Sequence, residues 1–198
     1  MVSWTKTGLY FVLLIKATDA ENHSSPAETE DGFVDLLLSA HEWDKEPIIL
    51  WGNESGFNAN DKSVIPQVDS PASFPMGVSL DFKVADLDYD GTNEIILLRS
   101  GGDANSGGTD IGYFYSGWYL QILDTNDKEI VDITDSIIET YYSDTQEQYC
   151  ANPANNWIMW ISVDDYDNDG NLDIFNKMMS NRPLHRWEWN GSKYSKVD

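Results

Sequence analysis

The sequence predicts an all-β protein built from antiparallel sheets. Its apolar stretches are short and rich in β-branched and aromatic residues, which favour strands over helices. Gly, Pro, Asn, Asp and Ser separate these stretches, as expected for turns. An acidic template, Asp-x-Asp-x-Asp-Gly-x-x-Asp/Glu, lies between predicted strands at 86–94 and again at 165–173. The 198 residues are enough for one domain with a core, so we expect a single domain over 1–198.

The first expected sheet covers about 1–65 and carries only the end of the template, Asp31-Gly32-x-x-Asp35. In simple register, Ala27 and Thr29 stand where the first two template Asp would be. Asp19 or Glu21 is the alternative source of ligands, if 21–30 is an insertion. Strands are expected at 9–17, 36–38 and 47–51, with a fourth beginning near Phe57.

A linker rich in Pro, Ser and Asp follows at 66–79, and the second sheet is expected over about 78–133. Its strands are predicted at 82–85, 95–99, 113–123 and 129–133, with a Gly-rich loop at 101–112. An insertion over 134–153 contains Ser136 and Glu139 at the spacing of a capping box, which predicts one short helix near 136–142.

The third sheet is expected over about 155–198, with strands at 157–163, 174–175, 185–189 and 193–197. Asn190-Gly191 predicts the hairpin turn between the last two. Asp31, Asp90 and Asp169 occupy the same template position, at intervals of 59 (31 to 90) and 79 (90 to 169) residues. A spacing of about 60 residues suits a repeated four-stranded sheet with its loops.

The two complete templates predict Ca²⁺ sites. Ca²⁺ takes about six to eight oxygen ligands, and carboxylates on alternate residues of a tight loop can converge on one point. The Gly at the sixth position permits the sharp turn. The acid at the ninth position is the natural closing ligand, and the backbone carbonyl of the seventh adds an oxygen. The expected ligands are Asp86, Asp88, Asp90, Thr92 and Glu94 in the first loop, and Asp165, Asp167, Asp169, Asn171 and Asp173 in the second.

An EF-hand does not explain these loops. It requires Glu at loop position 12 and flanking helices. Position 12 holds Leu97 in the first loop and Asn176 in the second, and the flanking residues favour strands.

The phrases FKVADLDYDGTNEIILL and ISVDDYDNDGNLDIF resemble the FG-GAP/VCBS repeat family, the calcium-loop blades of integrin-type β-propellers, which are also common in bacterial surface and secreted proteins. ILWGNESGF and HRWEWNGSKY resemble the outer hairpins of such blades. The resemblance implies a β-propeller-like fold of three four-stranded antiparallel blades, the first degenerate.

Closed propellers typically have about four to eight blades, so three imply a partial or incomplete ring. Three explanations stay open: a fragment of a longer propeller with further blades, a ring completed by self-association, or sheets packed without a ring. The degenerate first copy, near Asp31 and Asp35, is expected to bind calcium weakly or not at all.

Charge and cysteine content exclude several classes. The chain carries 34 acidic and 12 basic residues, a formal net charge of −22. Nucleic acids and anionic membranes require basic surface, so neither is an expected partner. Cys150 is the single cysteine, which rules out an intrachain disulfide. The apolar stretch 9–15 is too short to cross a bilayer and is a poor signal peptide, so it is expected to be a strand.

Aromatic residues have two expected roles. Trp187 and Trp189 alternate along a predicted strand and should pack on one face, between sheets. Four aromatics beside the Gly-rich loop are the candidates for an exposed ligand-binding patch: Tyr113, Tyr115, Trp118 and Tyr119.

These features predict a calcium-binding recognition or adhesion module, extracellular or on the cell surface, with the periplasm as another compartment that fits. It would present loops to a protein or a glycan, and its Ca²⁺ would be structural. No catalytic motif occurs in the sequence, so an enzyme is not expected. The alternatives are a polysaccharide lyase or glycoside hydrolase on a calcium-containing propeller, and an architectural surface repeat that self-associates.

Overall fold

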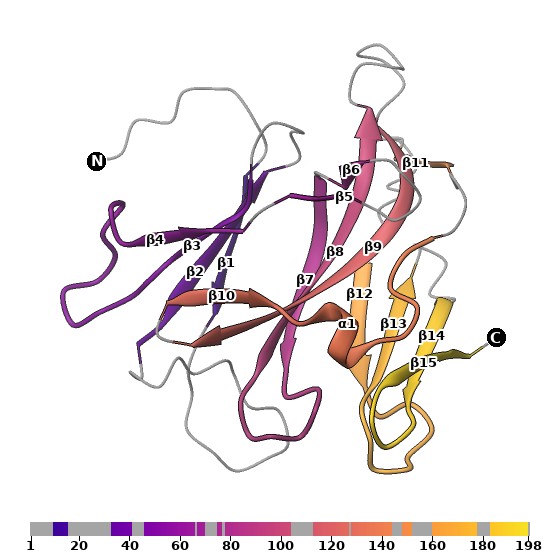
Figure 1. Ribbon diagram of the computed structural model, residues 1–198. Coiled ribbons are helices and arrows are strands. Elements are labelled where there is room, and N and C mark those ends of the chain that lie inside the picture. The colour runs from indigo at the N-terminus through magenta and orange to yellow at the C-terminus, as the bar shows by residue number, and fades with distance from the viewer. Residues whose placement is uncertain are drawn as a thin grey trace.

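The fold is mostly β, with three antiparallel sheets of at least four strands side by side (Figure 1). The computed structural model describes residues 10–15, 33–40, 46–65, 67–69, 75–76, 78–103, 113–126, 128–143, 148–151, 160–177 and 183–197. In the described part of the chain the three sheets remain separate and do not close on one another. No helix among those residues is long and apolar enough to cross a membrane.

The first sheet has its strands in sequence order: β1 (Tyr10–Ile15), β2 (Asp35–Ala40), β3 (Ile48–Leu50) and β4 (Lys62–Val64). The expectation that the fourth strand begins near Phe57 is wrong. Phe57 is 44% exposed in an irregular segment, and β4 begins five residues later, at Lys62. Asn53 and Asn58 each accept a backbone N–H two residues ahead, at 2.8 and 2.9 Å, and these Asx turns delay the strand.

The second sheet is central. Its order is β10 (Glu129–Asp132), β9 (Tyr113–Asn126), β8 (Glu94–Asp103) and β7 (Val78–Ala85). A fifth strand that the sequence did not predict, β11 (Gln148–Ala151), pairs with β9. The expected linker also contains a two-stranded pair, β5 (Val68–Asp69) and β6 (Pro75–Met76).

The third sheet again follows sequence order: β12 (Trp160–Asp164), β13 (Asp173–Lys177), β14 (Pro183–Trp189) and β15 (Tyr194–Val197). The Asn190-Gly191 turn joins β14 to β15 as predicted. Gly191 has φ 94°, and the Asn190 side chain accepts the backbone N–H groups of Ser192 and Lys193 at 3.1 and 3.0 Å.

The expected helix is shorter and earlier than predicted. α1 spans Thr134–Ile137, and Ser136 lies inside it rather than capping it. Ser136 Oγ donates to the carbonyl of Ile133 at 2.7 Å, so the capping-box prediction is wrong. After α1, Ile138 is extended and forms a parallel bridge with Tyr194. Pairing with β15 therefore ends the helix.

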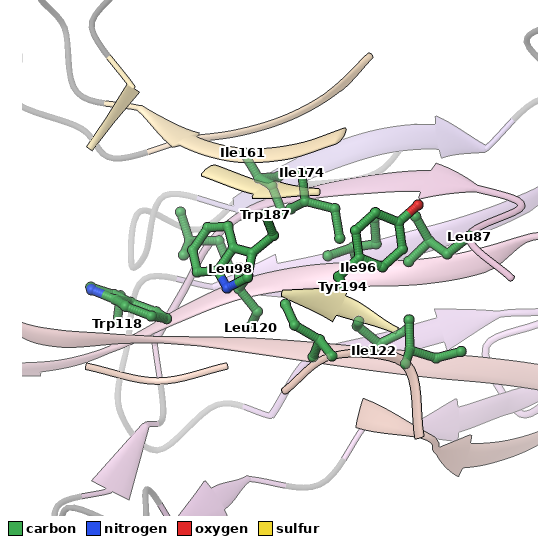
Figure 2. Close-up of a cluster of buried hydrophobic side chains, with 12 residues drawn as sticks. Leu87, Ile96, Leu98, Trp118, Leu120, Ile122, Ile161, Ile174, Trp187 and Tyr194 are labelled. Carbon is green, nitrogen blue, oxygen red and sulfur yellow. The ribbon is translucent and has the colours of Figure 1, made fainter. Parts of the chain in front are cut away.

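The central sheet is packed on both faces: successive strand residues point to opposite faces, and residues of both sets are buried. On one face Ile95 and Leu97 pack against the first sheet, in a cluster with Leu37 and Trp51. On the other face a larger cluster joins the central sheet to α1 and the third sheet (Figure 2): Leu87, Ile96, Leu98, Trp118, Leu120, Ile122, Ile137, Ile138, Ile161, Ile174, Trp187 and Tyr194.

The predicted packing of Trp187 and Trp189 is confirmed, since Trp187 is buried in the larger cluster and half-buried Trp189 packs against it. The third sheet is also tied to the central one by its first strand. Ile161 N–H donates to Asp81 Oδ2 on β7 at 3.0 Å. The β7–β8 and β12–β13 loops consequently lie at the same end of the molecule (Figure 1).

Candidate functional site

The two acidic templates form the β7–β8 and β12–β13 loops, and they have the same backbone shape. The fourth template residue has a left-handed φ in both, 63° at Tyr89 and 61° at Asn168. The sixth is glycine in both, with φ 95° at Gly91 and 93° at Gly170. An added Cβ would meet nothing within 4 Å at either glycine, so the positive φ and not lack of space is what favours glycine.

The first loop turns its backbone N–H groups toward its own carboxylates. Gly91 N–H donates to Asp86 Oδ2 at 3.1 Å, and Asp90 N–H donates to Asp88 Oδ1 at 3.2 Å. Asp90 Oδ1 in turn accepts the backbone N–H and the hydroxyl of Thr92, at 2.8 and 2.6 Å. Oxygens of Asp86, Asp88 and Asp90 then lie within 4.8 Å of one another.

The second loop repeats this pattern. Gly170 N–H donates to Asp165 Oδ2 at 3.0 Å, and Asp169 N–H donates to Asp167 Oδ1 at 3.2 Å. Asn171 donates to Asp169 through its backbone at 2.8 Å and through its side chain at 3.0 Å. Oxygens of Asp165, Asp167 and Asp169 also lie within 4.8 Å of one another. Two loops far apart in sequence therefore bring together the carboxylates of the same three template positions.

The acids at the ninth position have a different environment from the three Asp. Glu94 is 1% exposed and Asp173 is 3% exposed. Each accepts the N–H of the second template residue, from Leu87 at 2.6 Å and from Tyr166 at 3.0 Å. The structure does not bring Glu94 into the three-Asp group of its loop, so its predicted part as closing ligand stays a prediction.

Asp173 belongs to a group that the sequence did not reveal. Its oxygen lies within 4.8 Å of oxygens from Asp167 and Glu188. Glu188 is on β14 and pairs with Arg186. No spacing rule links Glu188 to the loop, because the pairing of β14 with β13 brings it there. The sequence contains one indication of it: charged and aromatic residues alternate along 185–189, which places Glu188 on the face opposite Trp187 and Trp189.

The electrostatics show how crowded the carboxylates are. Burial, together with repulsion from the charges of Asp88, Asp86 and Asp90, raises the pKa of Glu94 to about 7. Burial also raises the pKa of Asp88, with added repulsion from Asp90 and Asp86. Hydrogen bonds from Thr92 hold the pKa of Asp90 below its usual value.

The second loop divides its acids in the same way. Hydrogen bonds from Asn171 lower the pKa of Asp169, whereas burial, followed by repulsion from Asp167, raises that of Asp173. The most buried acid of each loop, Glu94 or Asp173, therefore resists ionisation, as Asp88 does in the first loop, and a cation would relieve this cost.

One polar atom in the first loop points to a missing partner. Asp86 Oδ1 is buried and accepts no hydrogen bond, although its other oxygen is bonded to Gly91 N–H. Buried carboxylate oxygens are normally paired with a donor or a cation. This oxygen, the hard-oxygen donor set and the shared loop shape fit Ca²⁺ better than a softer metal, which would prefer nitrogen or sulfur.

The two loops touch each other through Tyr89. Leu172 N–H of the second loop donates to Tyr89 Oη of the first at 2.6 Å. The Tyr89 ring also meets Trp189 edge-on, with centroids 5.7 Å apart. Burial raises the pKa of Tyr194, and the neighbouring Tyr89 hydroxyl and then the charges of Asp173 and Glu94 act in the same direction. The two loops therefore belong to one region of the molecule.

The expected degenerate site is only partly described. Asp35 is buried, and its Oδ1 accepts Gly52 N–H at 2.8 Å, which gives it a structural role between β2 and β3. Asp31, with Asp19, Glu21, Ala27 and Thr29, lies outside the described residues.

The expected aromatic patch is wrong for two of its members. Trp118 is 1% exposed and Tyr119 is 7% exposed, so neither offers exposed surface. The segment after α1 covers them: Ser143 N–H donates to the Trp118 carbonyl at 2.9 Å, and Tyr141 meets the Tyr119 ring. Tyr113 and Tyr115 lie on β9 opposite β11, and their side chains are outside the described part.

No protein-family model, curated protein or solved structure matches this chain. Its function is therefore inferred from the residues and contacts above.

Proposed function

We propose that the chain is a calcium-stabilised recognition module whose two acidic loops each hold one Ca²⁺. The observation that carries the proposal is the repeated loop. Two segments 79 residues apart (90 to 169) share backbone shape, hydrogen bonds and three converging carboxylates. One acidic turn could arise without a ligand, but a matched pair is better explained if both loops bind the same kind of cation.

Each site would be built from its loop. Asp86, Asp88 and Asp90 supply the first, with Glu94 and the carbonyl of Thr92 as further ligands. The second uses Asp165, Asp167 and Asp169, with Asp173 and the carbonyl of Asn171. Glu188 is an added candidate for the second site, since it lies within 4.8 Å of Asp167 and Asp173 oxygens.

The cation would act structurally by joining two strands that otherwise carry repelling charges. A ligand that binds only the folded state stabilises it by RT ln(1 + [L]/Kd), about 2.7 kcal/mol at 100 times Kd. Two sites would add about 5 kcal/mol, a large share of a typical domain stability of about 5–15 kcal/mol.

The wider proposal follows the resemblance to FG-GAP/VCBS repeats. The three sheets would be propeller-type blades, the first without a complete loop, and the module would face a protein or glycan outside the cytoplasm. Three meander sheets in the described chain, with two loops at one end, support this proposal. The net charge of −22 supports a calcium-rich surrounding over a nucleic-acid or anionic-membrane partner.

Calorimetric titration of Ca²⁺ into metal-free protein tests the proposal. We expect two sites per chain, with one lost in Asp88→Ala and one lost in Asp167→Ala. Glu54→Ala, which removes an exposed acid in the loop between β3 and β4, is the matched control and should keep both. Glu188→Gln should weaken the second site alone if Glu188 is a ligand.

Chelation gives an independent readout. Removing about 5 kcal/mol should lower Tm by about 10–20 °C for a chain of this size, and Mg²⁺ should restore it poorly. Absence of binding heat together with an unchanged melt in chelator would show that the loops are acidic turns only.

A further inference from the structure

A cavity of about 180 Å³ lies on the side of the central sheet that faces the third sheet. Its walls come from β9 through Trp118, from the segment after α1 through Glu139 and Ser143, and from β14 and β15 through His185 and Lys196. The metal-loop residues do not line it. It is therefore separate from the sites proposed above.

Backbone hydrogen bonds hold these walls in place. Ser143 N–H donates to the Trp118 carbonyl at 2.9 Å, and Glu139 N–H donates to the Tyr194 carbonyl at 3.0 Å. Trp187 Nε1–H donates to the carbonyl of Thr140, another lining residue, at 2.6 Å. The segment 139–143 is thereby clamped between β9 and the third sheet, so the cavity is formed before any ligand arrives.

The indole N–H of Trp118 is the group that points to a ligand. Trp118 is 1% exposed, and its Nε1 is buried without a hydrogen-bond partner. The other two buried tryptophans in the described chain do have acceptors, Ser63 Oγ for Trp51 and the Thr140 carbonyl for Trp187. Figure 2 shows the Trp118 nitrogen on the side of the ring away from the other labelled side chains. A buried donor without an acceptor is costly, so an acceptor in the cavity would satisfy it.

The remaining lining restricts the chemistry of that acceptor. Glu139 and Lys196 contribute one charge of each sign, and Thr140 and Ser143 contribute hydroxyl groups. Glu139 Oε2 already accepts the Ser195 hydroxyl at 2.8 Å, which leaves its second oxygen for a donor. A lone anion would be repelled by Glu139, and an apolar group would leave the Trp118 N–H without an acceptor. Hydroxyl groups suit a mixed lining because each both donates and accepts.

Size restricts the ligand further. Ligand pockets for drug-sized molecules occupy about 300–1,000 Å³. A cavity of about 180 Å³ is smaller, equal to about six waters at about 30 Å³ each. It therefore suits one compact ring. His185 and Tyr142 add aromatic surface to the walls, which suits the C–H face of a sugar ring.

We propose that this cavity binds one neutral sugar ring, with Trp118 Nε1–H donating to a ring oxygen or hydroxyl, Glu139 accepting, and Lys196 donating. The inference names a ligand class for the recognition function proposed above, and it therefore rests on the recognition part of that proposal. It does not depend on the calcium sites, because the cavity shares no residue with them.

The test follows the tryptophan indole N–H signals of the 198-residue chain by two-dimensional NMR in calcium-containing buffer. The probes are the methyl glycosides of glucose, galactose, mannose and N-acetylglucosamine, added singly, with sodium acetate and sodium phosphate as anion probes. Trp118→Phe identifies the Trp118 signal because it removes that signal alone. We expect at least one glycoside to shift it saturably, and neither anion to do so.

Variants then connect the binding to the proposed contacts. Trp118→Phe keeps an aromatic ring without the donor; read on the indole signal of Trp187, whose N–H donates to the lining residue Thr140, it should weaken binding about two- to tenfold, the range for one hydrogen bond. Glu139→Gln keeps an acceptor for Ser195 but removes the charge, and should weaken binding to a similar degree. Glu129→Gln, an exposed acid on β10, is the matched control and should bind as wild type does.

Several outcomes would overturn the inference. These are no glycoside-induced shift, a shift by the anions instead, or full affinity in both Trp118→Phe and Glu139→Gln. If Trp118→Phe does not fold, Glu139→Gln decides, since Glu139 is exposed. Glycoside binding in a chain that fails the calcium titration would leave this inference standing and reject only the metal sites.

Discussion

Replacing Tyr89 with Phe should uncouple the two acidic loops. Tyr89 Oη accepts Leu172 N–H at 2.6 Å, and this bond joins loops on different sheets. Phe keeps the ring contact with Trp189, whose ring centroid lies 5.7 Å away. Residue 89 must still adopt the same left-handed backbone conformation, with φ 63°. The substitution therefore removes the bond from Leu172 together with the contact between the Tyr89 and Tyr194 hydroxyl groups.

The magnitude follows from the exposure of the bond. A protein hydrogen bond contributes about 0.5–1.5 kcal/mol net. Tyr89 is 45% exposed, so a water molecule can replace the lost hydroxyl as the acceptor of Leu172 N–H. The lower half of that range therefore applies. A loss of about 0.5–1 kcal/mol corresponds to a Tm decrease of about 1–4 °C for a chain of this size. The same energy is a factor of about two to five in an equilibrium constant.

The assay is a double-mutant cycle read by calcium titration. In wild type, Asp167→Ala should empty the second site and weaken the first by about two- to fivefold, because an unordered second loop no longer holds Tyr89. In the Tyr89→Phe background, Asp167→Ala should leave the first site unchanged. Tyr166→Phe is the matched control, since it alters an exposed loop tyrosine whose ring contacts with Phe175 and Arg186 survive.

Two results would refute this reasoning. One is a Tyr89→Phe protein with the wild-type melting temperature and the wild-type dependence of the first site on Asp167. The other is an equal effect of Tyr166→Phe, which would show that any loop tyrosine matters and that the Leu172 bond is not the cause.

Three further outcomes are expected from thermal melts. Glu94 has a pKa raised to about 7, so the folded metal-free protein holds this proton more tightly than the unfolded chain does; the stability that Glu94 contributes should be full below about pH 4.5 and be lost as pH rises through 7. In chelator, Glu94→Gln should therefore raise Tm at pH 8 but not at pH 4. A rise at both pH values would contradict the raised pKa of Glu94. Trp118→Ala should cost about 3–5 kcal/mol because the side chain is buried, lowering Tm by about 6–20 °C, whereas a change under 2 °C would restore the exposed patch. Gly52→Ala should destabilise by about 1–3 kcal/mol, since its Cβ would lie 2.1 Å from the Val34 carbonyl oxygen; Gly56→Ala, with open space but φ 93°, separates this clash from backbone strain.

Local chemistry allowed the sequence alone to determine much of the fold. Strands and turns depend on neighbouring residues, so the period of two along 185–189 placed Trp187 and Trp189 on one face, and Asn190-Gly191 placed the last hairpin. The acidic template positioned both loops between strands, including the glycines that need positive φ. The helix was located only roughly, because its end depends on the bridge from Ile138 to Tyr194, which is not a local interaction.

Contacts between distant segments were decided only by the tertiary structure. Trp118 and Tyr119 sit beside a Gly-rich stretch that suggested exposure, yet residues 139–143 fold back over them and bury both. Strand pairing brought Glu188 to Asp173, and the packing of two sheets brought Tyr89 to Leu172. Each of these depends on which surfaces the sheets bury against one another. That choice is made by the whole core, and no short window of sequence contains it.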